Sequence, residues 1–326
     1  MEDLENKKYW IWFSLIKGLG CVRKNNLLKI YGTPEKIYKL SKRELLKVDG
    51  IGEETVTNII EAKNEKILNY HIKYMEENNI DIIHICEKSY PQALKQIYDA
   101  PVSLYIRGNK EILNGKNIGI VGCRECTDYG KKAAKYFAYN LSKEKSVNIV
   151  SGLAKGVDSY AHWGSVGANI ECESIKNCGK KQESCGKIND DCGKLNDDCG
   201  KLKNDCGKTI AILGNGLDMI YPKENIELAN EIIRRGGTII SEYPCGTKPD
   251  KMNFPARNRI ISGLSKGIIV IEAKEKSGTL ITVDFALEQG RDVFVVPGNI
   301  NSINSVGTND LIKQGAKMVT SYEDIR

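Results

Sequence analysis

Runs of hydrophobic residues alternate with amphipathic stretches between about residues 115 and 298. Six runs are typical of buried strands: NIGIVG (117–122), VNIVSG (147–152), TIAILG (209–214), TIISEYP (238–244), GIIVIEA (267–273) and DVFVVPG (292–298). Amphipathic helices are expected between them: near 129–143, from about residue 157, across 225–235 and across 280–289. Continuous Val/Ile runs between amphipathic helices indicate a parallel sheet covered on both faces. The pattern therefore predicts an α/β domain with a Rossmann-like, doubly wound, mostly parallel sheet.

The first 85 residues have a different pattern, in which short helices are separated by glycine turns. Two glycine–hydrophobic–glycine hairpins, Gly18 to Gly20 and Gly50 to Gly52, directly precede amphipathic helices. Glycine permits a tight turn that leaves backbone N–H groups free at a helix start, where a phosphate oxygen is favoured. The hairpins resemble the helix-hairpin-helix DNA-binding motif. The alternative is a helical bundle that uses glycine only to turn corners. We expect a small all-α, helix-hairpin-helix or SAM-like domain at 1–85.

A repetitive segment interrupts the second domain, which we place at 86–326. Cys-Gly-Lys recurs at positions 178, 185, 192, 199 and 206, with four mostly polar residues between repeats. Glycine in every heptad, without paired apolar positions, argues against a coiled coil. Zinc sites usually pair cysteines about two to four residues apart, which this spacing lacks. Because almost nothing apolar is available to bury, we predict a disordered insertion at 169–207 and no metal site.

Composition and charge limit the partners and the compartment. The 326 residues suit two domains, and a net charge of +6 with a pI near 8.6 allows nucleic acid as a partner without requiring it. Six of the eleven cysteines lie between Cys172 and Cys206 and five are scattered, which suits a reducing compartment. No apolar run reaches the ~18 residues of a membrane span, and acidic residues open the chain, unlike a signal peptide. We expect a cytoplasmic protein with no membrane partner.

Three enzyme motifs are present only in outline. The Gly214-Asn-Gly216 turn resembles a dinucleotide fingerprint, but Met219 stands where the third glycine belongs. A P-loop-like Gly-Lys-Thr at 207–209 lacks the first glycine and precedes a strand. A GxSxG match around Ser265 joins a helix to a strand, and no histidine follows it. We therefore predict no catalytic residue and no cofactor.

The ends of the predicted strands carry glycine loops and basic side chains together. Six residues could present backbone N–H groups to phosphates: Gly122, Gly152, Gly214, Gly216, Gly278 and Thr279. The basic residues of these loops are Arg124, Lys155, Lys223, Lys251 and Arg257. Phe254 could stack on an unpaired base, and Asn258 lies in the same segment. Because ligands of such sheets bind at the carboxyl ends of the strands, we expect a site for a polyanionic strand there.

These residues also have purely structural interpretations. The glycines could be only tight strand-to-helix turns, and Phe254 could be a core residue. For Asp158 we favour a structural role to a catalytic one: a buried hydrogen-bond acceptor that holds the loops. Arg259 could be the ion-pair partner of Glu242 or Glu272. The clustering of these residues is what favours a binding site.

Seven motifs follow one another in the second domain: SGLAKGVDSYAH, TIAILGNGLDMIYPKEN, SEYP, NFPARNRIISGLS, EAKEKSGTLIT, GRDVFVVPGNI and LIKQGAK. From about Tyr90 to Ile325, except for the repeats, the chain resembles the DNA-processing protein A (DprA/Smf) family. The resemblance implies a Rossmann-like domain that binds and protects single-stranded DNA, forms a homodimer and helps load RecA recombinase in natural transformation. A single-strand-binding protein is a further candidate partner.

The resemblance also implies roles for individual residues. Arg124 of a glycine-x-arginine motif and Lys223 of a YPK motif would contact DNA. The basic, aromatic and polar residues of the FPARNR region would do the same: Lys251, Phe254, Arg257 and Asn258. Cys123 stands where the family usually has serine, which removes one hydroxyl donor. The alternative function is a nucleotide N-glycosidase-type enzyme on a related Rossmann-like fold, in which Asp284 would have to replace the glutamate of the PGGxGT…E signature.

Overall fold

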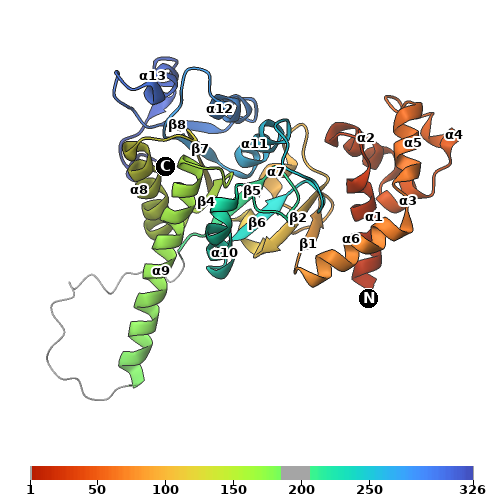
Figure 1. Ribbon diagram of the computed structural model, residues 1–326, viewed down its shortest axis with the longest axis horizontal. Coiled ribbons are helices and arrows are strands. Elements are labelled where there is room, and N and C mark those ends of the chain that lie inside the picture. The colour runs from red at the N-terminus through yellow and green to blue at the C-terminus, as the bar shows by residue number, and fades with distance from the viewer. Residues whose placement is uncertain (1, 185–205, 326) are drawn as a thin grey trace.

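The chain forms a helical part and an α/β part, which lie side by side in Figure 1. The structure is a computed structural model and describes residues 2–184 and 206–325. The helices of the helical part are α1 (Glu2–Leu15), α2 (Cys21–Tyr31), α3 (Pro34–Tyr38), α4 (Lys42–Leu45), α5 (Glu53–Glu61) and α6 (Glu65–Glu77). The sheet and the remaining helices form the α/β part.

The helical part is held together by one apolar core. Its almost completely buried side chains include Trp12, Phe13, Leu27, Ile37 and Ile59. Side chains also fix two helix starts, because Ser41 forms a capping box with Glu44 on α4 and Asn64 caps α6. The same core continues into the α/β part through Tyr105 and Ile239. The two parts therefore share buried apolar contacts.

One mixed sheet forms the centre of the α/β part. Its strands are β1 (Asp81–His84), β2 (Ser103–Gly108), β3 (Asn117–Val121), β4 (Asn148–Ser151), β5 (Thr209–Leu213), β6 (Thr238–Ser241), β7 (Gly267–Val270), β8 (Asp292–Val295) and β9 (Lys317–Met318). Within the described residues their order is β1-β2-β6-β5-β4-β3-β7-β8-β9. β2 pairs antiparallel with β1 and β6, and every other pair is parallel. The predicted fold class is confirmed.

Because of strand β1, the boundary between the two parts lies earlier in the chain than predicted. Residues Asp81–His84 pair with Ser103–Ile106, so the boundary predicted after residue 85 falls inside the sheet. β1 is four residues long, and only its two central residues are buried. Such a short edge strand has no apolar run long enough to distinguish it from a loop. The helical part therefore ends close to Glu77, the last residue of α6.

Helices cover both faces of the sheet. They are α7 (Gln92–Lys95), α8 (Asp128–Lys145), α9 (Val157–Ser184), α10 (Ile226–Arg234), α11 (Asn253–Leu264), α12 (Gly278–Glu288) and α13 (Val306–Lys313). α8 and α9 pack on one face through Phe137, Leu141 and Val157. α11 and α12 pack on the other face through Ile261 and Val283. Burial on both faces explains why the strands have almost no alternation of polar and apolar residues.

The direction in which strands are added reverses between β3 and β7. From β3 the chain adds β4, β5 and β6 outward on one side, and then returns to place β7 and β8 on the other side. The loops after β3 and β7 consequently diverge at the carboxyl edge of the sheet. Open α/β sheets bind ligands in the crevice that such a reversal leaves.

The predicted insertion begins as an ordered helix. α9 continues to Ser184, past the predicted start of disorder at residue 169. Buried Asn169 donates hydrogen bonds to the carbonyls of Ser165 and Gly207, and a disulfide joins Cys172 to Cys206. These contacts tie both ends of the segment to the domain, which corrects the predicted disorder at those ends. The rest of the predicted disorder, 185–205, lies outside the described residues.

The described residues contain neither a membrane-spanning helix nor a metal-ligating cluster. No helix in residues 2–184 and 206–325 is both long and apolar enough to cross a bilayer. In the same ranges, no group of three or more His, Cys, Asp and Glu side chains is placed to hold a metal ion.

Candidate nucleic-acid interface

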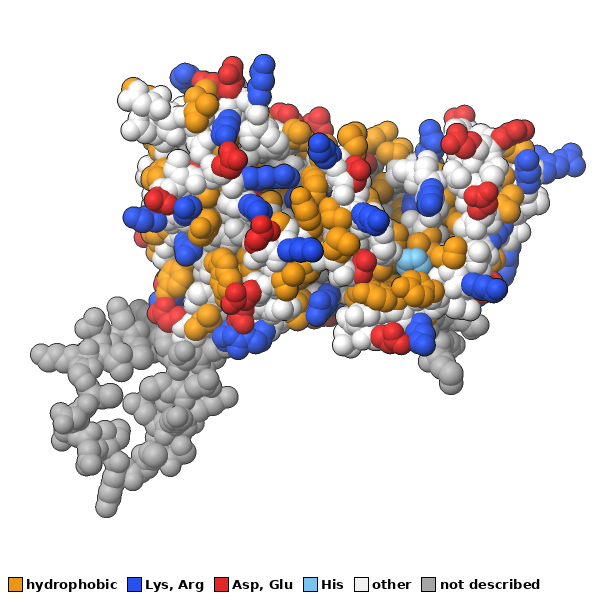
Figure 2. Space-filling view, viewed as in Figure 1, with side chains coloured by type: hydrophobic (Ala, Val, Ile, Leu, Met, Phe, Trp, Pro, Cys, Tyr) orange, Lys and Arg blue, Asp and Glu red, His pale blue; other side chains and the backbone are white. Residues whose placement is uncertain are grey.

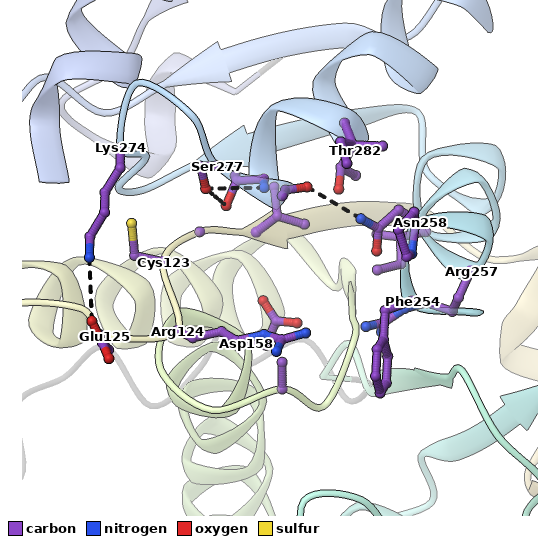
Figure 3. A pocket seen from close by; sticks show the side chains of 18 of the residues that line it. Cys123, Arg124, Glu125, Asp158, Phe254, Arg257, Asn258, Lys274, Ser277 and Thr282 are labelled. Atoms are coloured by element: carbon purple, nitrogen blue, oxygen red, sulfur yellow. Dashed lines mark hydrogen bonds and ion pairs between the residues drawn. The ribbon is translucent and has the colours of Figure 1, made fainter. Parts of the chain in front are cut away.

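A cavity of about 640 Å³ opens at the reversal between β3 and β7 (Figure 3). Its walls come from the loop after β3 (121–125), the loop after β7 and the start of α12 (274–282), and the start of α11. Ala154 of the loop after β4 and Asp158 at the start of α9 also line it, together with Tyr221 and Lys251. The cavity therefore lies where the sequence pattern placed the binding site.

A cation and two aromatic rings are stacked at one side of the cavity. The guanidinium of exposed Arg124 lies 5.4 Å from the centre of the Phe254 ring. That ring stacks on Tyr221, with 5.7 Å between ring centres and 27° between the planes. A Cβ on Gly214 would lie 2.9 Å from the Phe254 ring, so glycine is needed to let the ring sit there. Phe254 is thus a half-buried ring beside the cavity and not a core residue.

Tyr221 is a site residue that the sequence predictions omitted. It lines the cavity and is 44% exposed, so its ring is available to another flat group. The YPK motif directed attention to Lys223 alone. The spacing from Tyr221 to Phe254 contained no signal that the two rings meet.

Arg257 is buried beneath the cavity and differs from its predicted role as a DNA contact. It is 4% exposed, and its Nη1 donates to the carbonyl of Ile212 at 2.6 Å. Burial lowers the pKa of Arg257 to about 10, although the nearby Asp158 carboxylate opposes this shift. A Cβ on Gly152 would lie 1.8 Å from Nη1, so the loop after β4 closes directly over the guanidinium. Arg257 therefore supports the loops from below.

Asp158 has the structural role favoured from the sequence. Its buried carboxylate accepts the backbone N–H of Gly152 at 3.1 Å. Burial raises the pKa of Asp158, whereas the charge of Arg257 opposes the rise. The carboxylate thus holds the loop after β4 against the start of α9, and the interpretation as a buried acceptor is confirmed.

Three of the six predicted phosphate-binding amides are already used within the chain. The N–H of Gly152 donates to Asp158, that of Gly216 donates to the carbonyl of Thr247, and that of Thr279 donates to Ser277 Oγ. Their predicted role is corrected, because these loops fold by satisfying their own N–H groups. Gly122 is needed for space, since a Cβ there would lie 2.6 Å from Val157.

Gly278 keeps a place in the candidate site. It lines the cavity at the first residue of α12, and a Cβ there would have no heavy atom within 4 Å. Its carbonyl accepts a hydrogen bond of 3.4 Å from the side-chain amide of Asn258. Asn258 therefore connects the starts of α11 and α12 across the cavity.

The predicted lysines differ in their distance from the cavity. Lys251 is exposed and lines it, but Lys155 and Lys223 are exposed outside the lining. Lys155 pairs with Glu224, the residue after Lys223. Lys274 and Lys276 also line the cavity and were missed, although the EAKEKSG segment places both of them directly after β7.

Charged and apolar side chains are mixed on this side of the molecule. Figure 2 shows lysine and arginine side chains interspersed with hydrophobic ones over the middle of the α/β part. Among the residues that the structure describes, two carboxylates line the cavity. Glu125 pairs with Lys274 at 3.3 Å, and Asp158 lies beside Arg257. The arrangement favours a ligand with negative charge and flat apolar groups.

Arg259 joins the two parts of the chain. It pairs with Glu242 at 2.6 Å and with Asp99 at 2.8 Å, and it is 5% exposed. Cys21, the first residue of α2, donates its thiol to the same Glu242 carboxylate at 3.6 Å. The structural ion pair proposed for Arg259 with Glu242 is confirmed, and Glu272 instead accepts hydrogen bonds from Thr127.

The two glycine hairpins have the predicted backbone and differ in their charged neighbours. Gly18 and Gly50 have φ of 69° and 77°, and Gly20 and Gly52 are the N-caps of α2 and α5. The first hairpin lines a groove of about 700 Å³ that also contains Asp99, Glu242 and Arg259 of the α/β part. The second hairpin is followed directly by two exposed acids, Glu53 and Glu54. Acids therefore oppose a phosphate at the start of α5, whereas the groove beside α2 also contains Arg23 and Lys24.

Comparisons with known proteins match both parts of the chain. The family described as DNA recombination-mediator protein A matches residues 81–186 and 201–326, and the SAM-like helix-hairpin-helix tandem matches residues 14–64. The DNA processing protein DprA of Bacillus subtilis is 39% identical over 278 residues, which are 85% of this chain and 80% of that protein. DprA of Streptococcus pneumoniae is 40% identical over 241 residues, which are 74% of this chain and 71% of that protein.

Solved structures agree with these matches. The crystal structure of DprA from Streptococcus pneumoniae has a TM-score of 0.76 at 32% identity and covers 98% of this chain and 96% of that chain. A structure of DNA processing protein A from Helicobacter pylori, described for its single-stranded DNA binding mode, has a TM-score of 0.57 at 27% identity. It covers 76% of this chain and 93% of that chain. The chain therefore belongs to the DNA processing protein A (DprA/Smf) family.

Proposed function

We propose that this protein binds single-stranded DNA at the cavity between β3 and β7. The observation that carries the proposal is the exposed stack of Arg124, Phe254 and Tyr221 beside the lysine-lined opening. Unpaired bases stack on aromatic rings, and lysine or arginine side chains neutralise the backbone phosphates. Family membership and the single-strand binding described for the Helicobacter pylori relative support the same assignment.

We further propose that the bound strand is DNA in the course of recombination. The protein would protect incoming single strands during natural transformation and help load RecA recombinase onto them. It would act as a homodimer in the cytoplasm, with a single-strand-binding protein as a further partner. The family description as a recombination mediator supports this role. Sedimentation with and without RecA would test the dimer and the RecA contact.

The nucleotide N-glycosidase alternative has little support from the cavity carboxylates. Hydrolysis of this kind needs an acid or base that can reach the glycosidic bond. Glu125 is ion-paired with Lys274, and buried Asp158 accepts a backbone hydrogen bond. Asp284, the substitute considered from the sequence, is exposed on α12 and does not line the cavity. We therefore propose a binding protein without catalysis at this site.

Fluorescence anisotropy with labelled oligonucleotides tests the site. We expect Phe254→Ala to weaken single-strand binding about tenfold, since stacking on one ring contributes about 1–3 kcal/mol per base. Arg124→Ala should lower affinity by a similar factor and reduce the slope of log K against log salt by about 0.7. Arg124→Lys should recover the salt slope and only part of the affinity, because lysine lacks the flat group that stacks on Phe254.

The control is Lys66→Ala, which removes one exposed charge from α6 in the helical part. It should leave binding within about twofold of wild type, as expected for a charge outside the contact region. Wild-type protein that binds duplex and single strands equally, or Phe254→Ala protein with unchanged affinity, would contradict this site.

A further inference from the structure

A group of lysines surrounds one tyrosine ring where α8 and α9 pack together. Lys131 Nζ lies 5.9 Å and Lys135 Nζ lies 5.4 Å from the ring centre of Tyr160. Lys132 and Lys135 are exposed, and Lys131 and Tyr160 are half-buried. We call Lys131, Lys132, Lys135 and Tyr160 the α8 lysine patch. It contains none of the residues that line the cavity.

The patch is connected to the Arg124 loop along one face of α9. A Cβ on Gly156, just before α9, would lie 2.3 Å from the carbonyl oxygens of Cys123 and Arg124. A Cβ on Gly164 would lie 2.6 Å from the carbonyl oxygen of Lys135. Gly156, Tyr160 and Gly164 are spaced four residues apart, so they follow the same side of the helix. Tyr160 therefore lies between the Arg124 loop and the crossing of α8 with α9, about 6 Å along the axis from Gly156.

The two ammonium groups beside the Tyr160 ring together favour binding of an anion. Lys131 and Lys135 are four residues apart on α8, and like charges at this spacing repel each other. The electron-rich face of Tyr160 attracts both ammonium groups and keeps them together. Asp128 pairs with Lys131 at 2.8 Å and its charge also acts on Lys132, but its carboxylate is 86% exposed.

We propose that the α8 lysine patch binds backbone phosphates of the single strand after it leaves the cavity past Arg124. This inference rests on the proposed function and extends the contact from the cavity onto the outer surface of α8. Tyr160 is a positioning residue in this proposal, because it acts through the two lysines. Phosphate contacts fix the path of a strand without reading its sequence, so the patch should bind all sequences alike.

Oligonucleotide length separates the patch from the cavity. We would measure anisotropy with oligothymidines of about four and about sixteen nucleotides, lengths that bracket common single-strand sites. Lys131→Ala/Lys135→Ala should weaken binding of the longer strand about tenfold and reduce its salt slope by about 1.4, at about 0.7 per phosphate. Binding of the shorter strand should stay within about twofold of wild type, because the cavity contacts remain. Lys66→Ala/Lys73→Ala on α6 removes the same net charge and should leave both lengths unchanged.

Substitutions at Tyr160 test the positioning role. Tyr160→Phe keeps the ring face and should bind the longer strand as wild type does, whereas Tyr160→Leu should lose about threefold. Thermal unfolding by circular dichroism would verify that all variants are folded. Equal losses on both lengths, or no loss on the longer strand, would overturn the patch and leave the cavity proposal intact. Wild-type protein that bound neither length would overturn both proposals.

Discussion

The loop after β4 is controlled by three residues, none of which needs to touch DNA. Gly152 donates its N–H to Asp158, and its missing side chain leaves room for the buried Arg257 guanidinium. Arg257 donates in turn to the carbonyl of Ile212 at the end of β5. A buried cation, a buried carboxylate and a glycine thus fix the loops that form one wall of the cavity. The hydrogen bonds of Gly152 and Arg257 hold this loop in place within the protein itself.

Gly152→Ala tests this packing through stability. The new Cβ would lie 1.8 Å from Arg257 Nη1, so the guanidinium would have to leave its hydrogen bond with Ile212. We expect the free energy of unfolding to fall by about 3 kcal/mol, as for displacing a buried hydrogen-bonded charge. Urea unfolding followed by circular dichroism would measure the change.

Gly278→Ala is the matched control, because a Cβ there has no heavy atom within 4 Å. It should change the free energy of unfolding by less than about 0.5 kcal/mol. Similar effects of the two substitutions would mean that loss of glycine flexibility, and not contact with Arg257, determines stability at Gly152.

At the scale of single residues, the sequence predicted several residues that line the cavity and misjudged the exposure of others. Motif spacing located Arg124 and Phe254, because both follow strand ends that the hydrophobic pattern marks clearly. It could not separate exposed Arg124 from buried Arg257, since both are arginines in basic loops and only packing decides their exposure. The backbone N–H groups of Gly152, Gly216 and Thr279 were predicted to be free because the sequence does not show which acceptors the packing places beside them. Their partners, such as Thr247 for Gly216, are distant in sequence.

At the scale of elements, the clearest departure concerns the glycine hairpins. Their turns form as predicted, but the charges around α2 and α5 decide what they can bind. α2 begins beside the Glu242 carboxylate, and α5 begins with Glu53 and Glu54. Acids in a first turn stabilise their own helix by interacting with the positive end of its dipole, and their negative charge repels a phosphate there. We therefore propose that the α5 hairpin has a structural role in this chain.

Removing the two acids of α5 should create weak duplex binding. With Glu53→Gln/Glu54→Gln, the exposed helix start would no longer repel phosphates, and we expect duplex affinity at low salt to rise about threefold. Glu76→Gln/Glu77→Gln changes the net charge equally at the C-terminal end of α6, where duplex affinity should change less. Anisotropy with a labelled duplex gives both values. If the two variants gained equally, the effect would come from net charge and not from the hairpin.

The elements predicted from hydrophobic pattern were those with long apolar runs. Strands β3 to β8 were found because both faces of each are buried, which requires continuous Val and Ile. β1, β2 and β9 lie at or near the sheet edges and were not predicted, and β9 has only two residues. The ordered start of the insertion was also missed, because Asn169 and Cys172 are held by residues 206 and 207 on the far side of the repeats. Such a contact has no local signal in sequence.

At the scale of the whole molecule, an ion-pair cluster connects the helical part to the α/β part. Arg259 of α11 pairs with Glu242 and Asp99, and Cys21 of α2 donates to Glu242. The carboxylates of Glu242 and Asp99 raise the pKa of Arg259, so it stays charged. Burial, and to a smaller extent the Glu242 carboxylate, raise the pKa of the Cys21 thiol to about 11. The order of the motifs predicted both parts but not this junction, because Cys21, Asp99 and Glu242 belong to three separate segments.

Arg259→Met should weaken this junction more than removal of the entire charge cluster. The single variant leaves the Glu242 carboxylate, only 10% exposed, without its cation, and loss of one member of such a pair costs about 3–5 kcal/mol. Asp99→Asn/Glu242→Gln/Arg259→Met removes all three charges and should recover about half of that loss, because no buried charge remains unpaired. Urea unfolding of wild type and both variants gives the free energies. Trp10 and Trp12 belong to the helical part and Trp163 belongs to α9, so a Trp163→Phe background restricts tryptophan fluorescence to the helical part. In that background, fluorescence and circular dichroism would give different midpoints for Arg259→Met if the helical part then unfolds first. Coincident midpoints with a loss below about 1 kcal/mol would mean that the shared apolar core, and not the ion pairs, holds the two parts together.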